Sequence, residues 1–223
     1  RTIGVNEIQR NPGGNRDISK VIQSLPGAGS SVGFRNDIII RGGGPSENRF
    51  YLDGMEIPNI NHFATQGANG GPVGILNVDF LQDVGFYSGA FPANRGNTLS
   101  SVFDFKQKNP RSDNWHAAFT VGSSDIGLRA EGPVNEKSGL MLSVRRSYLK
   151  FLFTALELPF LPTYNDVQLK YKYKFNQKNE LTFLMLGAYD VAVLNTKNNE
   201  TETQQYILDN LPEQKQWSYT TGL

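Results

Sequence analysis

The stretch Val167-Gln168-Leu169-Lys170-Tyr171-Lys172-Tyr173-Lys174-Phe175 decides the fold, because its side chains alternate in character without a break. The odd-numbered positions are aliphatic or aromatic, and the even-numbered positions are glutamine or lysine. Successive side chains of a β-strand point to opposite faces, so this stretch predicts a strand with one apolar and one polar face.

The same period of two recurs on both sides of this strand. It predicts four further strands and the start of a sixth, at residues 115–122, 126–131, 140–145, 181–189 and 217–223. The alternation over 181–189 is weaker, because Leu184 and Leu186 are also apolar. Two structures show this pattern. One is the antiparallel sheet of a soluble protein, with its apolar face on a core. The other is the wall of a transmembrane barrel, apolar toward lipid and polar toward the lumen.

Three features favour the barrel. The predicted strands are about 8–11 residues long, which is the length that a tilted strand needs to cross a bilayer. Short connections at 133–137 and 176–179 alternate with long ones at 149–165 and 191–216, although the link at 123–124 is also short. Aromatic residues stand at the predicted strand ends, where interfacial girdles lie: Trp115, Tyr148, Tyr173, Phe175, Tyr189 and Trp217.

The first 110 residues have a different composition. Seventeen of the 23 glycines lie in residues 1–100, which predicts a compact domain with many turns, ending near Asn109-Pro110-Arg111. The apolar spacing predicts a helix over 17–25, and Asp53-Gly54 predicts a hairpin between 49–52 and 55–57. Further strands are expected at 38–40, 84–87 and 101–106, with another short helix within 72–81. The expected fold class is therefore an α+β domain, with a small mixed sheet and short helices, followed by antiparallel transmembrane strands.

Composition and motifs exclude several classes of function. The net charge of +1 gives no electrostatic argument for nucleic acid binding, and the chain has no cysteine. His62 and His116, the two histidines, lie far apart in the sequence, so no metal site is predicted. The glycines at 42–44 lack the lysine of a phosphate-binding loop, and the sequence has no nucleophile elbow. We therefore expect neither an enzyme nor a bound cofactor.

Three segments of the first domain resemble the plug-domain signature of TonB-dependent outer-membrane receptors. Ile39-Ile40-Arg41-Gly42-Gly43 is similar to the strand end of that signature, and Phe50-Tyr51-Leu52-Asp53-Gly54 to its hairpin. The stretch 83–93, with Arg95-Gly96 and the strand 100–105, is similar to the later part of the plug. In this chain Asn94-Arg95-Gly96 replaces the aromatic residue usual there. Glu131-Gly132-Pro133 and the segment 145–148 are similar to receptors of Bacteroides-type bacteria.

The resemblance implies a plug at residues 1–110 and the first strands of a barrel of about 22 strands at 111–223. It implies TonB-dependent uptake of a scarce nutrient across the outer membrane of a Gram-negative bacterium. The expected partners are a TonB-type energy-transducing protein, which binds a segment before Arg1, outer-membrane lipid, and a small-molecule, oligosaccharide or peptide ligand. The alternative is a soluble β-rich ligand-binding or adhesion module, which would need no detergent and would cover both sheet faces with protein.

Two groups of candidate site residues follow. A plug held by hydrated ion pairs is easier to release than one held by a hydrophobic seal, since such pairs are individually weak. The expected plug–barrel contacts are Arg41 and Arg95 on the plug and Arg129, Glu131 and Arg145 on the lumenal face, with Asp53 or Glu56 as possible carboxylate partners. The loop 59–71 is expected to face the ligand, with Asn59, Asn61, His62 and Phe63 as the candidate contacts.

Overall fold

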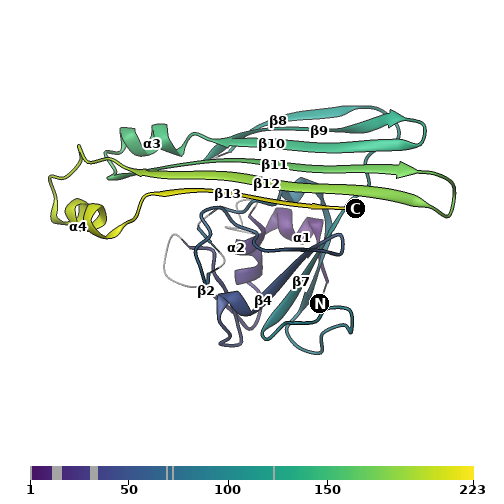
Figure 1. The fold of residues 1–223 in the computed structure, drawn as a ribbon, viewed down its shortest axis with the longest axis horizontal. Coiled ribbons are helices and arrows are strands. Elements are labelled where there is room, and N and C mark those ends of the chain that lie inside the picture. Colours follow the sequence, from purple (N-terminus) through teal and green to yellow (C-terminus); the bar gives the residue numbers. More distant parts are fainter. Residues whose placement is uncertain (1, 12–16, 31–34, 69, 72, 123) are drawn as a thin grey trace. The chain divides into compact units, whose positions relative to one another are not determined.

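The computed structural model describes residues 2–11, 17–30, 35–68, 70, 71, 73–122 and 124–223. The chain divides into two compact units, residues 1–109 and residues 110–223. Each unit is built around its own sheet (Figure 1).

The first unit is an α+β domain. In chain order its elements are β1 (Thr2–Gly4), α1 (Val5–Arg10), α2 (Ile18–Gln23), β2 (Ala28–Ser30), β3 (Ile38–Ile40), η1 (Pro45–Glu47), β4 (Asn48–Leu52), β5 (Met55–Ile57), η2 (Val78–Phe80), β6 (Leu81–Tyr87) and β7 (Ser101–Gln107). Over the described residues the main sheet has the order β1-β6-β7-β4-β5. The strands β4 and β7 run parallel, whereas the other neighbours are antiparallel, so the predicted small mixed sheet is confirmed.

Most elements predicted for this unit are present. The helix predicted over 17–25 is α2, and the predicted hairpin is the antiparallel pair β4–β5. The short helix expected within 72–81 is the 3-10 helix η2, which is a single turn. The Asn77 side chain accepts a hydrogen bond from the Asp79 N–H and starts this turn, and the chain then enters β6 directly.

Aromatic rings form much of the core of the first unit. Phe103 on β7 stacks on Phe50 of the parallel neighbour β4 and on Phe86 of the antiparallel neighbour β6, with ring centroids 5.7 and 4.9 Å apart. Phe103 and Phe105 are completely buried. Stacked rings contribute beyond their buried area. The cluster therefore fixes the register of the three central strands.

The second unit is an antiparallel sheet with two helices in its connections. Its elements are β8 (His116–Val121), β9 (Asp125–Asn135), β10 (Ser138–Ser147), α3 (Leu149–Ala155), β11 (Phe160–Lys174), β12 (Glu180–Leu194), α4 (Glu202–Asn210) and β13 (Gln214–Gly222). Each strand pairs with the next one in the sequence, which gives the order β13-β12-β11-β10-β9-β8. The short β9–β10 and β11–β12 turns lie at one end of the sheet, and the connections with α3 and α4 at the other (Figure 1).

Two of the strands are longer than the sequence pattern predicted. β11 and β12 have 15 residues each and pair along their whole length, from Phe160↔Leu194 to Lys174↔Glu180. The long connections are correspondingly shorter than expected, at 148–159 and 195–213. Tyr189 and Trp217 were expected at strand ends, but they lie inside β12 and β13 and pair with each other.

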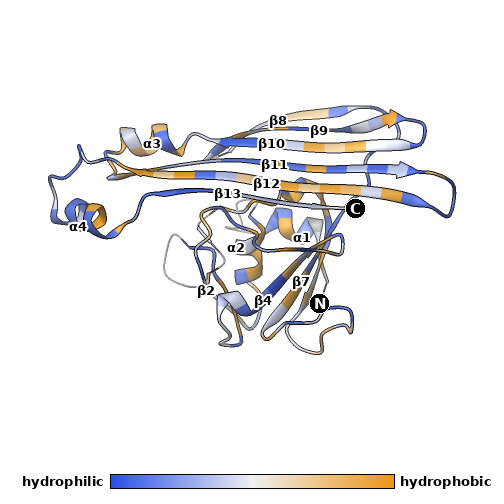
Figure 2. Cartoon of the chain, viewed as in Figure 1, coloured by the Kyte–Doolittle hydropathy of each residue, from blue (hydrophilic) through white to orange (hydrophobic). Residues whose placement is uncertain are grey.

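The two faces of this sheet differ sharply in exposure. Phe119, Leu128 and Val144 share the apolar face and expose 67%, 55% and 46% of their surface. On the opposite face Asp166, Gln168 and Lys170 of β11 are buried. The segment that predicted the strand keeps this polarity, because Val167, Leu169, Tyr171 and Tyr173 all lie on the apolar face and none is buried. Figure 2 shows apolar residues recurring along β10 and β12, while the β11–β12 turn is hydrophilic.

Among the residues that the structure describes, no helix is long and apolar enough to span a membrane.

Candidate functional site

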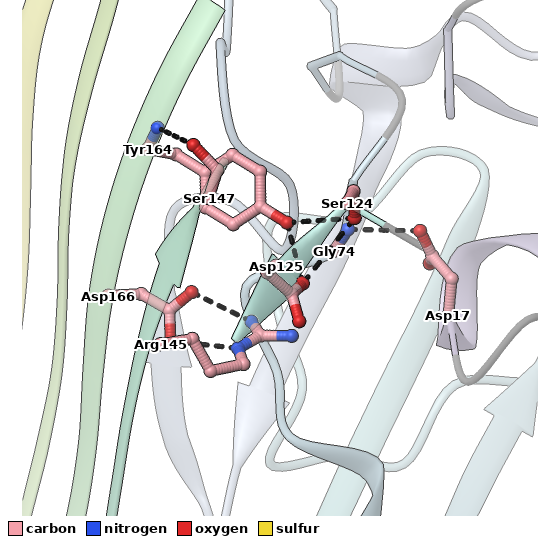
Figure 3. Close-up of polar contacts among 8 residues, drawn as sticks. All are labelled: Asp17, Gly74, Ser124, Asp125, Arg145, Ser147, Tyr164 and Asp166. Atoms are coloured by element: carbon pink, nitrogen blue, oxygen red, sulfur yellow. Dashed lines mark hydrogen bonds and ion pairs between the residues drawn. The ribbon is translucent and has the colours of Figure 1, made fainter. Parts of the chain in front are cut away.

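A buried carboxylate joins four segments of the first unit. Asp17 is the N-cap of α2, where its Oδ1 accepts a hydrogen bond from the Ser19 N–H at 2.9 Å. Its Oδ2 accepts hydrogen bonds from the Gly74 N–H at 2.9 Å and from Asn36 Nδ2 at 2.7 Å. Ser19 Oγ donates at 2.8 Å to Oδ1 of Asn61. The start of α2, the segment before β3 and both strands of the loop 59–75 therefore meet at one group, which Figure 3 shows in part.

Burial raises the pKa of Asp17, although the hydrogen bonds from Ser19, Asn36 and Gly74 and the nearby charge of Lys20 act in the opposite direction. Desolvation disfavours the charged form of a carboxyl, and three donors compensate for only part of this cost. Space around the carboxylate is also restricted. A Cβ atom at Gly74 would lie 3.0 Å from Asp17 Oδ1, so a larger residue there would push the carboxylate out of place.

The loop 59–75 folds back on itself close to this carboxylate. Asn61 and Gly74 form an isolated antiparallel bridge, and the His62 N–H donates to the Val73 carbonyl at 2.9 Å. The Gly71 N–H donates to the carbonyl of His62 at 2.7 Å. These backbone bonds make the loop a narrow hairpin whose base is held by the Asp17 carboxylate.

The four residues expected to face a ligand all lie on one strand of this hairpin. Asn61 and His62 are buried, whereas Asn59 and Phe63 are partly exposed. Asn59 caps the turn, since its Oδ1 accepts the Ile60 N–H at 2.9 Å. Phe63 has a positive φ of 56° and its ring lies 6.4 Å from that of His62. The structure therefore brings the four together, and ligand contact by them stays a prediction.

A second polar cluster lies on the polar face of the second unit. Arg145 of β10 and Asp166 of β11 are paired residues of neighbouring strands. They form a two-point ion pair, in which Arg145 Nε lies 3.0 Å from Oδ1 and Nη2 lies 2.9 Å from Oδ2 of Asp166. The Asp166 side chain is 1% exposed and that of Arg145 15%, so water screens this pair weakly.

Tyr164 extends this cluster toward the end of the sheet that carries α3. Its hydroxyl donates to Asp125 Oδ2 at 2.6 Å and lies 3.1 Å from the hydroxyl of Ser124, while its N–H donates to Ser147 Oγ at 2.8 Å (Figure 3). Tyr148, at the end of β10, donates its hydroxyl to the Gly122 carbonyl. The β8–β9 connection and the ends of β10 and β11 are therefore joined by side chains. Ser123, in the middle of that connection, lies outside the described residues.

The two arginines expected on the plug side differ in environment. Arg41 is exposed and has a positive φ of 52°, just before the glycines at 42–44. Arg95 lies inside its own unit, with Nη2 2.8 Å from Asp104 Oδ2 and its guanidinium 4.3 Å above the Tyr51 ring. The expected carboxylate partners also have contacts within the first unit. Asp53 accepts the Gln107 N–H at 2.8 Å, and Glu56 lies 3.7 Å from Arg49.

The three charged residues expected on the lumenal side all lie on the polar face of the sheet. Arg129 pairs with Ser143 of β10, and Glu131 pairs with Met141, which pairs in turn with Lys170 of β11. Arg145 contacts Asp166 of its own unit, as described above. Contact between these residues and the plug stays a prediction. No group of histidine and acidic side chains in the described residues is arranged to hold a metal ion.

Several residues of these clusters were not among the sequence candidates. Asp17 could have been found in part, because an aspartate just before an apolar helix stripe indicates an N-cap. Its contacts with Asn36 and Gly74 span 19 and 57 positions and leave no local signal. The strand register places three further residues on the same face of the sheet as Arg145, namely Asp125, Tyr164 and Asp166. They could be assigned to this face only once the register was known.

The family model described as TonB-dependent Receptor Plug Domain matches residues 1–101. No curated protein matches the sequence. Among solved structures, a mutant ferric enterobactin receptor (PfeA) from Pseudomonas aeruginosa has a TM-score of 0.63 at 15% identity, covering 99% of this chain and 37% of that one. The siderophore receptor PirA from the same organism gives 0.57 at 14% identity, with 86% and 34% covered.

The outer membrane transporter YddB from Escherichia coli gives a TM-score of 0.56 at 17% identity, covering 85% of this chain and 33% of that one. The chain thus spans about a third of the length of these structures. At these identities the structures share the fold, in which a plug is followed by the antiparallel strands of a plugged barrel. Residues 1–101 of this chain thus match the plug domain of TonB-dependent receptors, and the chain shares its fold with solved outer-membrane receptors and transporters.

Proposed function

We propose that the chain takes part in TonB-dependent uptake of a scarce nutrient, with residues 1–110 as the plug and 111–223 as the first strands of the barrel wall. The observation that carries the proposal is the two-faced sheet that follows the plug domain in the sequence. Its apolar face is exposed and its polar face carries the Arg145–Asp166 pair. A barrel wall needs this polarity, since one face meets lipid and the other meets water.

The proposed partners follow from the same assignment. A TonB-type protein would bind a segment N-terminal to Arg1, outer-membrane lipid would cover the apolar face, and the ligand would be a small molecule, an oligosaccharide or a peptide. Two of the similar structures are described as receptors for ferric enterobactin and for a siderophore. A ferric siderophore is therefore the first ligand to test.

The hydrogen bonds of the Asp17 carboxylate suggest how a pull on the N-terminus would reach the ligand side of the plug. β1 and α1 precede Asp17 in the chain, and the carboxylate holds the hairpin of residues 59–75 through Gly74 and Asn36. Displacement of the N-terminal segment would strain these hydrogen bonds first. The hairpin with Asn59, Asn61, His62 and Phe63 would then lose its support, and a ligand bound there would be released.

The plug–barrel contacts are the second part of the proposed mechanism. We propose that Arg41 and Arg95 on the plug and Arg129, Glu131 and Arg145 on the sheet hold the plug through polar contacts that water can replace. Arg41 is the sharpest test, because it is exposed, whereas Arg95 and Arg145 already contact Asp104 and Asp166. Arg41→Ala should abolish uptake while the receptor still assembles. Unchanged uptake would count against the contact.

The experiment for the function itself uses the full-length receptor in a strain that lacks its own siderophore receptors. Uptake of radioactive iron as a ferric catecholate should require both the receptor and an intact TonB system. Uptake that persists without TonB would contradict the proposal. Recovery of the receptor in the soluble fraction without detergent would favour the β-rich binding or adhesion module instead.

A further inference from the structure

The segment that leads into the second unit, residues 110–115, packs against two glycines of the β9–β10 hairpin. Pro110 lies against Gly139 of β10, since a Cβ atom at Gly139 would be only 2.7 Å from the Cβ of Pro110. Trp115 lies against Gly132 of β9, where an added Cβ atom would be 2.8 Å from the indole Cγ. A larger residue at either glycine would displace this segment. The two glycines are therefore sites that the segment fills, and we call residues 110–115 the strap.

The two glycines lie on opposite faces of the sheet. Gly139 pairs with Lys172 of β11 and belongs to the polar face. Gly132 pairs with Leu140, which belongs to the apolar face. Successive side-chain positions of a strand alternate between the faces, so an atom that fills the Cβ position of a glycine lies on the face of that glycine. The strap therefore holds the β9–β10 hairpin from both faces.

The middle of the strap carries a charged cluster. Nε and Nη2 of Arg111 lie 3.0 and 2.8 Å from the two carboxylate oxygens of Asp113, and His116 Nε2 lies 3.6 Å from Oδ2. The hydrogen bond from Arg111 lowers the pKa of Asp113, so the carboxylate is charged at neutral pH. Ion pairs as exposed as these contribute little to stability. Packing at the two glycines is therefore the main attachment of the strap.

The chain just before the strap is attached to the first unit. Directly after β7 ends, the Lys108 N–H donates to the carbonyl of Phe80 at 2.9 Å. Asn109 alone separates Lys108 from Pro110 in the sequence, and two residue steps span at most about 7 Å. The end of β7 therefore cannot move far from the β9–β10 hairpin while the strap is in place.

The two ends of the first unit differ in how firmly the sheet holds them. β1 is an edge strand of three residues that pairs only with β6. β7 has seven residues, lies between β6 and β4, and carries the stacked ring of Phe103. A pull on the N-terminus therefore separates β1 from the sheet well before it reaches β7.

We propose that the strap is the fixed point of plug movement. It stays closed during uptake, so that displacement begins at β1 and the end of β7 remains attached to the barrel wall. Pro110 and Trp115 act as positioning residues, because they hold the last strand of the plug in place while other parts of the plug move. The inference rests on the proposed function, since it needs a plug that moves when the N-terminus is pulled.

Introduced cysteine pairs test which segments separate during uptake, because the chain has no cysteine of its own. Pro110→Cys with Gly139→Cys cross-links the strap to β10, since the two residues are in contact and a disulfide needs Cβ atoms about 3.8 Å apart. Gly4→Cys with Asp83→Cys cross-links β1 to β6, where the two residues are paired. In the oxidised full-length receptor, the first pair should leave TonB-dependent uptake of the ferric catecholate at the wild-type rate. The second pair should abolish uptake until a reductant is added.

Loss of uptake in the cross-linked strap that a reductant restores would overturn the inference, because the strap would then have to open. A wild-type receptor without TonB-dependent uptake would instead overturn the proposed function.

A second test needs no ligand. A flexible Gly-Ser repeat inserted after Asn109 frees the end of β7 and leaves the contacts of the strap intact. Cells with this receptor should become sensitive to vancomycin, which an intact outer membrane excludes, and only when TonB is functional. The matched control places the same repeat after Lys178, in the exposed β11–β12 turn, and should cause no sensitivity. Resistance of the Asn109 variant, or sensitivity that persists without TonB, would contradict a fixed point at the strap.

Discussion

Three hydrogen bonds lower the pKa of the buried Asp17 carboxyl and desolvation raises it, and desolvation is the larger effect, so the pKa is raised. The same group supports the start of α2 and the base of the hairpin of residues 59–75. A carboxylate in this position stabilises the plug by satisfying buried donors, at the cost of its own desolvation. Its replacement therefore has two separable effects, one structural and one that depends on pH.

The pH effect can be isolated with Asp17→Asn. Because the pKa of Asp17 is higher in the folded than in the unfolded state, the folded plug binds the extra proton more readily as the pH falls from neutral toward about 4. The stability contributed by protonation of Asp17 is fully present below the pKa of this group in the unfolded state. It is lost as the pH rises through the pKa in the folded state. Wild type should therefore gain stability relative to Asp17→Asn as the pH is lowered. Urea unfolding of the plug in the receptor, followed by proteolysis at several pH values, measures the difference.

Two results of that comparison are informative. The Asn36 and Gly74 donors remain in Asp17→Asn, and the new amide group turns a donor toward one of them, so the variant should be less stable at every pH. A stability difference that does not change with pH would show that the Asp17 carboxylate does not titrate in this range. Asp83→Asn, on the sheet surface beside Lys106 at 4.0 Å, is the matched control.

The Arg145–Asp166 pair gives a second prediction at the scale of single residues. Asp166→Asn leaves the Arg145 guanidinium buried without its counter-charge, which destabilises a protein by about 3 kcal/mol. The Glu180→Gln control removes a pair with Lys172 in which the carboxylate is half exposed, and it should change stability much less, because solvent screens this pair. Thermal unfolding of the purified receptor compares the two. Equal shifts would mean that water screens the buried pair as fully as the exposed one.

The connection between β12 and β13 is organised by a helix cap. Thr201 Oγ1 accepts the Gln204 N–H at 3.2 Å, and Gln204 Oε1 accepts the Thr201 N–H at 3.0 Å. Gln204 also donates through Nε2 to the carbonyl of Glu157, at 3.1 Å, in the connection that carries α3. The cap therefore both starts α4 and ties the two long connections together.

Thr201→Ala should loosen this helix without affecting the strands. Loss of an N-cap costs about 1 kcal/mol, so amide hydrogens of α4 should exchange about fivefold faster with solvent. Thr203→Ala changes the same side chain inside the helix, where alanine is favourable, and should not speed exchange. Hydrogen exchange with mass spectrometry distinguishes the two variants. Faster exchange in both would indicate that the cap is not what holds α4.

The strands in which apolar and polar residues alternate most regularly were the ones that the sequence predicted most accurately. The stretch from Val167 onward was recognised as a strand. The start of β11 at Phe160 was not, because Pro162 and Asn165 interrupt the alternation of apolar and polar residues although both are paired in the strand. α4 was missed, although Thr201 followed by Gln204 is the signature of a capping box. The contacts of Asp17 could not be predicted, since they depend on how the chain folds between distant segments.

At the scale of the whole molecule, the exposed apolar face decides whether the sheet belongs in a membrane. Phe119 and Thr120 are neighbours on β8 and point to opposite faces, with Phe119 67% exposed. Phe119→Lys should impair assembly in the outer membrane, because lysine on a lipid-facing strand costs about 2–4 kcal/mol near the bilayer midplane. Thr120→Lys adds the same charge toward the lumen and should assemble normally. Heat-modifiable mobility on gels reports assembly, and the reverse ranking would contradict the assignment of the two faces.

The β11–β12 pair is longer than a bilayer requires. A tilted strand needs about 9–11 residues to cross, and these strands have 15, so in the proposed barrel wall about four residues of each would continue past the headgroups as a paired ribbon. α4 begins eight positions after β12 ends at Leu194. The reach of this part of the receptor into the surrounding medium is thus set by hydrogen-bonded backbone, whose span does not vary with temperature or salt as that of a flexible tether would.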